Sequence, residues 1–274
     1  MKIVEVRHSN RRSLEKIIRA GASVAEVEID FQIIESADFE SEFENLKTDE
    51  ELKLMVATPG HSVDLVEMAP SQTTVVFGSE EFDSFLHYSD RWWPQHFFAE
   101  TLKRFITKNI EHLDRKSDAL IAGLDTFPAA CAWALSQVGF QRVLIAANEE
   151  EDAPSLVTRL KRNFFGVQWT PCTADELTEQ AGTFSFLLTS LDEERDDVVL
   201  NNLYYFNFLK PGGIVLDTRL MQGTPPLIKE ALEINAQTYT GIEFYSLWAS
   251  LVFEKLTGKE IDSDAVVAEY LRQQ

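Results

Sequence analysis

A short turn at residues 123–128, with the sequence GLDTFP, holds the residues that bear most directly on cofactor chemistry. It follows an apolar run at residues 119–122 and precedes an alanine-rich stretch with the spacing of a helix. In a doubly wound sheet, a strand, a turn and a helix in this order hold the pyrophosphate of a dinucleotide. Several glycines let the backbone approach the phosphates there, and this turn has only Gly123. Asp125 adds a negative side chain where two phosphate charges would lie, so the turn predicts a loss of ordinary dinucleotide binding.

Asp125 and Thr126 have a second use, as the cap of a helix that Pro128 opens. Side-chain oxygens of Asp and Thr accept hydrogen bonds from the first amides of a helix, and Pro is favoured in its first turn. A helix whose first amides are satisfied in this way no longer offers them to an anion. We therefore expect this helix to satisfy its own N-terminus.

Strands and helices alternate on both sides of this turn. The apolar runs predict strands at residues 119–122, 142–147, 167–170, 184–189 and 214–217, and helices at residues 129–138 and 155–165. Alternation at this spacing is typical of right-handed βαβ units, which build a parallel sheet. The second half of the chain therefore reads as a Rossmann-like, doubly wound domain.

The first half reads as a smaller α/β unit. Alternating apolar residues predict strands at 2–6, 23–31, 54–58 and 73–77, with helices at 12–19, 35–53 and 63–68. A long amphipathic helix at residues 94–113 is suited to connect the two halves. The tail is helical, with one helix at 241–256 and a last one capped by Asp262 or Ser263. We expect an N-terminal α/β domain over residues 1–116, a Rossmann-like domain over 117–237, and C-terminal helices over 238–274 that return to the first domain.

The composition excludes several classes of partner. The 274 residues include 45 acidic and 25 basic side chains, and a net charge of -20 repels nucleic-acid phosphates and anionic lipids. Two cysteines far apart in sequence make neither a disulfide framework nor a metal-ligand pattern. The N-terminus has no apolar signal segment, and no run of about 18 apolar residues predicts a membrane span. We expect a cytoplasmic protein with no nucleic-acid or membrane partner.

Five segments of the chain, in the right order and at about the right spacing, resemble the shikimate dehydrogenase family. Residues 209–227 (LKPGGIVLDTRLMQGTPPL) are similar to the family's L-x-P-G-x-x-V-x-D-x-x-Y segment and the T-P-L that follows it. Residues 241–258 (GIEFYSLWASLVFEKLTG) resemble its G-x-x-M-L-x-x-Q-A helix. Residues 7–9, 56–61 and 88–90 fall where the family has H-S-x-S-P, V-T-x-P-x-K and N-T-D. The resemblance covers essentially the whole chain.

This resemblance implies an N-terminal domain that binds shikimate, a Rossmann domain that binds NADP, and a cleft between them. The family transfers a hydride between the cofactor and a ring carbonyl, while a lysine and an aspartate handle the proton. The lysine falls on His61 and the aspartate on Asp90. A His–Asp pair can do acid–base work near neutral pH. The alternative is that His61 is simply a polar residue after the Pro-Gly turn.

The substrate-binding positions match the family poorly. Ser9 fits the first serine, but Leu220 replaces a tyrosine and Trp248 replaces a glutamine. Met55 and Ala57 stand where asparagine and threonine would bind substrate hydroxyls. Each hydroxyl left without a partner costs about 1–3 kcal/mol, so useful affinity for shikimate is lost. Either a flatter, more apolar ligand binds, or Trp248 and Leu220 fill the old pocket.

The residues that follow the second Rossmann strand also argue against NADP binding. NADP-dependent members have N-R-T there, whereas this chain has Asn148, Glu149 and Glu150. Glu149 would repel a 2′-phosphate, but a carboxylate at this place can bind the ribose hydroxyls of NAD. The alternative is a solvated acidic turn, because residues 149–152 are all acidic. We therefore expect no cofactor, and NAD in preference to NADP if either binds.

Three functional hypotheses follow. In the first, the chain is a shikimate dehydrogenase-like protein with degenerate sites, which binds a small molecule in the interdomain cleft or a protein partner. In the second, it is an NAD-preferring oxidoreductase for a shikimate- or quinate-like cyclic hydroxy acid, using His61 and Asp90. A methyltransferase, suggested by LKPGG at residues 209–213, is disfavoured because the first strand lacks that class's glycine-rich acidic signature.

Overall fold

The computed structural model describes residues 1–9, 11–59, 61, 72–109, 113–147, 151–179, 182–189, 191, 198–221 and 223–273. The chain forms two compact units, one of residues 1–101 and 245–274, the other of residues 102–244. Both borders fall inside helices, α5 (Phe97–Lys108) and α11 (Gly241–Thr257). The domain borders expected from the sequence stand at residues 116 and 237.

The first unit is built on a five-stranded sheet in the order β2-β1-β3-β4-β5. Its strands are β1 (Lys2–Arg7), β2 (Asp30–Glu35), β3 (Leu52–Ala57), β4 (Ser84–Tyr88) and β5 (Arg91–Gln95). The strands β2, β1 and β3 are parallel, whereas β4 runs antiparallel to β3 and forms a hairpin with β5. The central strands β1 and β3 are mostly buried, as expected for strands covered on both faces.

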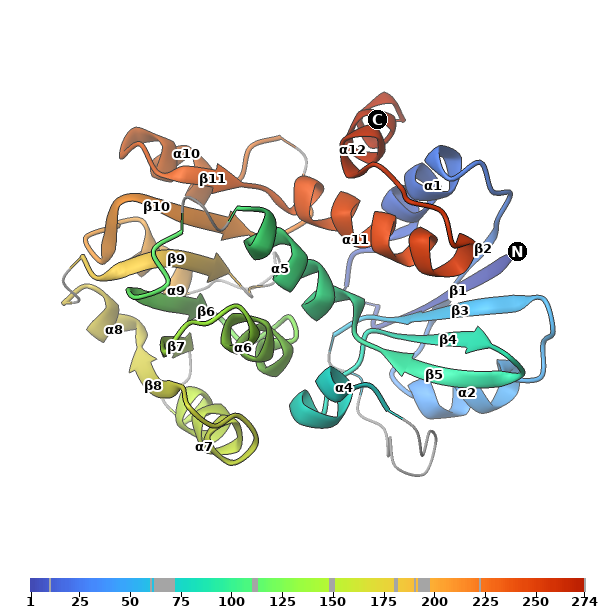
Figure 1. The fold of residues 1–274 in the computed structure, drawn as a ribbon, viewed down its shortest axis with the longest axis horizontal. Helices are drawn as coiled ribbons and strands as arrows, with labels where there is room; N and C mark the ends of the chain where they lie inside the picture. The colour runs from blue at the N-terminus through green and yellow to red at the C-terminus, as the bar shows by residue number, and fades with distance from the viewer. Residues whose placement is uncertain are drawn as a thin grey trace. The chain divides into compact units, whose positions relative to one another are not determined.

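Helices cover both faces of this sheet (Figure 1). One face carries α2 (Phe39–Leu46), and the other carries α1 (Glu15–Val24), α12 (Ser263–Arg272) and the part of α11 that belongs to this unit. Gly21 allows α1 and α11 to approach closely, because a Cβ at this position would lie 2.8 Å from the Phe253 ring. Asp262 caps α12 by accepting a hydrogen bond from the Asp264 amide, as predicted.

The second unit is a six-stranded parallel sheet in the order β11-β10-β9-β6-β7-β8. Its strands are β6 (Asp118–Ala122), β7 (Arg142–Ala147), β8 (Gln168–Thr173), β9 (Phe184–Thr189), β10 (Leu209–Asp217) and β11 (Gln237–Tyr239). This is the strand order of the dinucleotide-binding Rossmann fold, in which the order reverses between the first and fourth strands of the domain. The predicted doubly wound sheet is therefore confirmed, and its reversal point lies between β6 and β9.

Short helices complete this unit: α6 (Pro128–Gln137), α7 (Asp152–Asn163), α8 (Ala174–Leu177), α9 (Val198–Leu203) and α10 (Pro226–Glu233). A buried apolar core joins the sheet to the helices α8, α9 and α10 through residues such as Leu177, Leu203 and Ile228. Among the described residues, no helix of either unit is long and apolar enough to cross a membrane.

Two local predictions for the first unit were wrong, and one element was missed. Residues 73–77 form the start of helix α4 (Thr74–Ser79) instead of a strand, because the Thr73 hydroxyl caps it at the Val76 amide. The predicted strand at residues 23–31 is the end of α1 followed by a loop, and β2 starts only at Asp30. The hairpin of β4 and β5 was not predicted. The helix expected at residues 63–68 lies outside the described residues.

Candidate functional site

His61 and Ser9 both lie at the carboxyl edge of the first sheet. Ser9 is exposed and follows the end of β1, and the His61 Nε2 atom lies 3.2 Å from the Val6 carbonyl oxygen on the same strand. The His61 ring stacks on His8, with centroids 4.2 Å apart, and contacts Phe39 at 5.6 Å. Burial lowers the pKa of His61, and the neighbouring His8 lowers it further. The half-buried His61 side chain is therefore a neutral imidazole near pH 7.

Asp90 and His61 lie at opposite ends of the strands of this sheet. Asp90 forms, with Ser89, the two-residue turn between β4 and β5, and both residues have positive φ as in a type I′ hairpin. Because β4 is antiparallel to β3, this turn lies beyond the first residue of β3, on the side where β1 begins (Figure 1). A six-residue strand spans about 17–20 Å. The structure therefore does not bring His61 and Asp90 together.

Trp248 is enclosed in the core of the first unit. Its side chain is 1% exposed, and its indole N–H donates to the Asp83 carboxylate at 3.4 Å. Asp83 also accepts hydrogen bonds from the Phe97 and Phe98 amides, so it holds the N-terminus of α5. Burial raises the pKa of Asp83 to about 6, although these hydrogen bonds oppose the shift. Sequence reasoning missed Asp83, which is the polar residue that precedes β4.

His96 packs against the same carboxylate. The Nδ1 atom of His96 accepts a hydrogen bond from the Ala99 amide at 3.3 Å and lies 3.7 Å from the Asp83 Oδ2 atom. Its side chain is buried, and burial lowers the pKa of His96 to about 3. His96 is therefore neutral in the folded protein at all pH values near neutrality.

This burial predicts an acid-sensitive contribution to stability. Below pH 6.5 an unfolded chain protonates His96 while the folded protein does not, so the free energy of unfolding falls by up to about 1.4 kcal/mol per pH unit. Asp83 acts in the opposite direction between pH 6 and 3.8, where only the folded state binds its proton.

Replacement of His96 by glutamine removes the first effect and keeps the second. Urea unfolding at pH 7, 6, 5 and 4 should show that His96→Gln gains stability relative to the unchanged protein as the pH falls. A difference between the two proteins that stays constant with pH would contradict a neutral buried His96.

The predicted cofactor turn keeps its glycine but differs at the helix start. Gly123 has a φ of 86°, and its amide donates to the Ala146 carbonyl at 2.8 Å. Helix α6 begins at Pro128 as predicted, but its N-cap residue is Phe127, whose side chain makes no capping bond. The N-cap position expected for Asp125 or Thr126 is taken by Phe127, which has a left-handed conformation with φ of 48°. Asn148 and Glu149 lie outside the described residues.

Phe127 changes what this turn can accommodate. A left-handed conformation costs a non-glycine residue about 1–2 kcal/mol, and the ring of Phe127, which is mostly buried, offsets that strain by packing. A dinucleotide turn instead uses small residues here, so that the backbone approaches the phosphates. The geometry at residues 125–127 therefore combines a carboxylate with a bulky ring beside the helix start.

A buried ion pair that sequence reasoning missed lies at the carboxyl end of β10. The Arg219 guanidinium donates to both Asp217 carboxylate oxygens, at 2.9 and 2.6 Å, and the Thr189 hydroxyl lies 3.1 Å from the same carboxylate. Asp217 is fully buried, and Arg219 is 7% exposed. The backbone beside the pair is closely packed, because a Cβ at Gly241 would lie 2.2 Å from the Arg219 carbonyl oxygen. The signal in the sequence is an arginine two residues after a strand-ending aspartate; the half-buried Leu220 follows it.

In the part of the chain that the structure describes, no group of three or more His, Cys, Asp or Glu side chains gathers that could hold a metal ion. Cys131 and Cys172 are both buried, and no disulfide joins them.

Known proteins match this chain by structure but not by sequence. The chain matches no family model, and no curated protein matches it by sequence. Solved structures do match it: shikimate dehydrogenase from Mycobacterium tuberculosis has a TM-score of 0.80 at 14% identity, covering 99% of both chains. Quinate dehydrogenase from Corynebacterium glutamicum, solved with NAD, has a TM-score of 0.82 at 11% identity, covering 99% of both chains. Shikimate 5-dehydrogenase from Thermus thermophilus, solved with NADP(H) and shikimate, has a TM-score of 0.76 at 14% identity, covering 100% of both chains.

These matches define the class of fold. A Rossmann-ordered sheet and a separate five-stranded α/β unit occur together in one chain. The chain has the fold of the shikimate and quinate dehydrogenases, as the sequence resemblance predicted.

Proposed function

We propose that this chain is a shikimate dehydrogenase-like binding protein that does not reduce or oxidise shikimate with NADP. One observation carries the proposal: Trp248, which stands where the family has a substrate-binding glutamine, is fully buried and bonded to Asp83. An indole enclosed in the core cannot pair with a substrate hydroxyl. The partner would be a small molecule bound by the first unit or another protein.

The cofactor side supports the same proposal. The turn after β6 presents Asp125, and the residue before α6 is the bulky Phe127. A carboxylate repels the two negative charges of a pyrophosphate, and a turn without small residues does not give the close backbone approach that they need. Either of these features alone would weaken the binding of a dinucleotide, and here both occur within three residues.

Titration of the purified protein with NADH and NADPH, followed by cofactor fluorescence, tests the proposal. We expect no saturable change up to millimolar cofactor, and no NADP- or NAD-dependent oxidation of shikimate or quinate at millimolar substrate. An active shikimate dehydrogenase assayed in parallel controls for the reagents. Submillimolar NADPH binding together with shikimate turnover would overturn the proposal.

A divergent NAD-preferring oxidoreductase for a cyclic hydroxy acid is the second candidate. It is favoured by His61 and Ser9 sharing the carboxyl edge of the first sheet, and by the similar quinate dehydrogenase that was solved with NAD. His61 would then serve as acid and base without Asp90. Submillimolar NADH binding with quinate turnover would support this candidate, provided that His61→Ala abolishes turnover and Asp90→Asn leaves it unchanged.

A further inference from the structure

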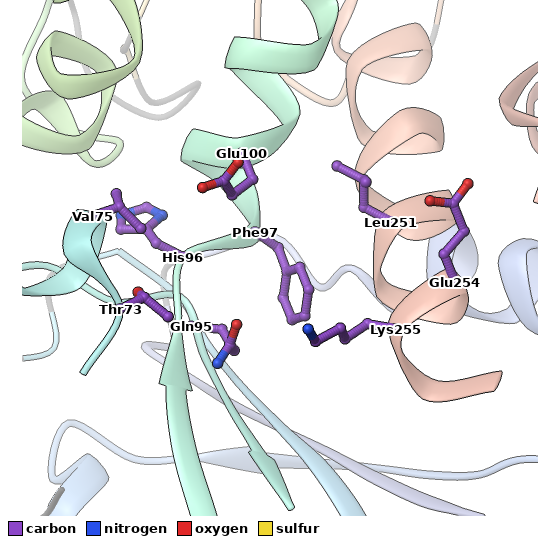
Figure 2. Close-up of a pocket in the computed structure, with 9 residues that line it drawn as sticks. All are labelled: Thr73, Val75, Gln95, His96, Phe97, Glu100, Leu251, Glu254 and Lys255. Atoms are coloured by element: carbon purple, nitrogen blue, oxygen red, sulfur yellow. The ribbon is translucent and has the colours of Figure 1, made fainter. Parts of the chain in front are cut away.

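A pocket of about 400 Å³ lies in the first unit, beside the edge strand β5 (Figure 2). Its lining comes from the start of α4, the end of β5, the first turn of α5 and the last turns of α11. In the sheet order, β5 is separated by β4 from β3, and β3 lies beside β1, where Ser9 and His61 are found. The volume lies in the range of small-molecule sites, about 300–1,000 Å³. Ser84 pairs with both Val56 and Gln95, so the pocket lies at the same end of the sheet as Ser9 and His61 but two strands away from β3.

Opposite charges stand on different sides of this pocket. Figure 2 shows the carboxylates of Glu100 and Glu254 above the Phe97 ring, with the Lys255 ammonium and the Gln95 amide below it. Lys255 is exposed and makes no ion pair with the residues that the structure describes. A ligand with charge of only one sign would meet repulsion on one side of the pocket. A dipolar ligand would meet an opposite charge at each end.

His96 forms a fixed, uncharged part of the pocket wall. The imidazole is 1% exposed, and its Nδ1 atom accepts from the Ala99 amide. A neutral ring that accepts at Nδ1 carries its hydrogen on Nε2. The side chain is held inside the fold, so this wall of the pocket is already ordered before a ligand binds.

The middle of the pocket is apolar. Phe97 and Val75 are buried, and Leu251 is half-buried on α11. Such surfaces favour the burial of a hydrocarbon side chain at about 25 cal/mol per Å². Hydrocarbon between two opposite charges is the arrangement that complements an amino acid with an apolar side chain.

We propose that this pocket binds a free α-amino acid with an apolar side chain. Its carboxylate pairs with Lys255 and the Gln95 amide, its ammonium pairs with Glu100, and its side chain packs on Phe97 and Leu251. The proposal does not depend on whether the protein is a dehydrogenase.

Isothermal titration of the full-length protein with three molecules that share an isobutyl group tests this inference. L-leucine carries both charges, 3-methylbutan-1-amine lacks the carboxylate, and 4-methylpentanoate lacks the amine. We expect L-leucine to bind with a Kd of about 1 mM or lower, and each single-charge analogue to bind at least about tenfold more weakly.

Two variants locate the binding. Lys255→Gln should weaken the binding of L-leucine at least about tenfold and leave the binding of 3-methylbutan-1-amine unchanged. Glu100→Gln should weaken the binding of L-leucine by a similar factor and leave the binding of 4-methylpentanoate unchanged. Lys259→Gln, an exposed lysine just after α11 and outside the pocket lining, is the matched control and should bind as the unchanged protein does. No heat with L-leucine, equal binding of the three molecules, or equal effects of Lys255→Gln and Lys259→Gln would each overturn the proposal. A circular dichroism spectrum of each variant shows that it is folded.

Discussion

Replacement of Trp248 by alanine should lower the free energy of unfolding by about 3–5 kcal/mol. The side chain is 1% exposed, so its loss leaves a cavity that the surrounding helices can fill only in part. The Asp83 carboxylate would also lose the indole donor, although it keeps the Phe97 and Phe98 amides at the start of α5. Urea denaturation followed by far-ultraviolet circular dichroism measures the change.

Phe77→Ala is the matched control for this prediction. Phe77 is an aromatic residue of the same unit, but it is 76% exposed on α4. Its truncation should change the free energy of unfolding by no more than about 0.5 kcal/mol. Similar values for the two variants would mean that Trp248 is not packed as the structure has it, and the argument for a filled substrate site would fail.

The Rossmann-like sheet could be predicted because its strands are nearly continuous apolar runs. The runs at residues 142–147 and 184–189 match β7 and β9 at both ends. Strands buried on both faces need apolar residues at every position, so the signal does not depend on a partner far away in sequence. Turn glycines and prolines marked the helices between them, as at Pro128.

The first unit was harder to predict because tertiary contacts override its local patterns. The sequence TTVVF has strong strand propensity, yet Thr73 caps it as helix α4, with adjacent Val75 and Val76 both buried. The β4–β5 hairpin has Ser89 and Asp90 at its turn, without the glycine that usually marks a type I′ turn. A proline in β5 is tolerated because β5 is an edge strand.

The missed hairpin explains why the candidate site was only partly predicted. Matching Asp90 to a catalytic aspartate assumed that it lies near His61. The hairpin turn instead puts Asp90 at the opposite end of the strands from His61. The buried carboxylate near α5 is Asp83. Its environment depends on Trp248, which is far from it in sequence, so no local pattern could reveal the contact.

Replacement of Arg219 by methionine should lower the free energy of unfolding by about 3–5 kcal/mol. The change leaves the fully buried Asp217 carboxylate without its cation, while the Thr189 hydroxyl and the backbone amide of residue 219 stay as donors. Breaking one side of a buried pair costs more than removing both sides, because an unpaired charge then stays in the core. The double variant Asp217→Asn with Arg219→Met should therefore be more stable than Arg219→Met alone.

Arg142→Met is the control that shows how much stability is lost when an exposed arginine is removed. Arg142 pairs with Asp118 in the same unit, but its side chain is 52% exposed, so the loss should be within about 1 kcal/mol. Urea unfolding of the four proteins at pH 7 gives the comparison. If Arg219→Met were as mild as Arg142→Met, Asp217 would have to be hydrated. The carboxyl end of β10 would then be open to solvent, and a ligand-binding role for Arg219 would gain support over a structural one.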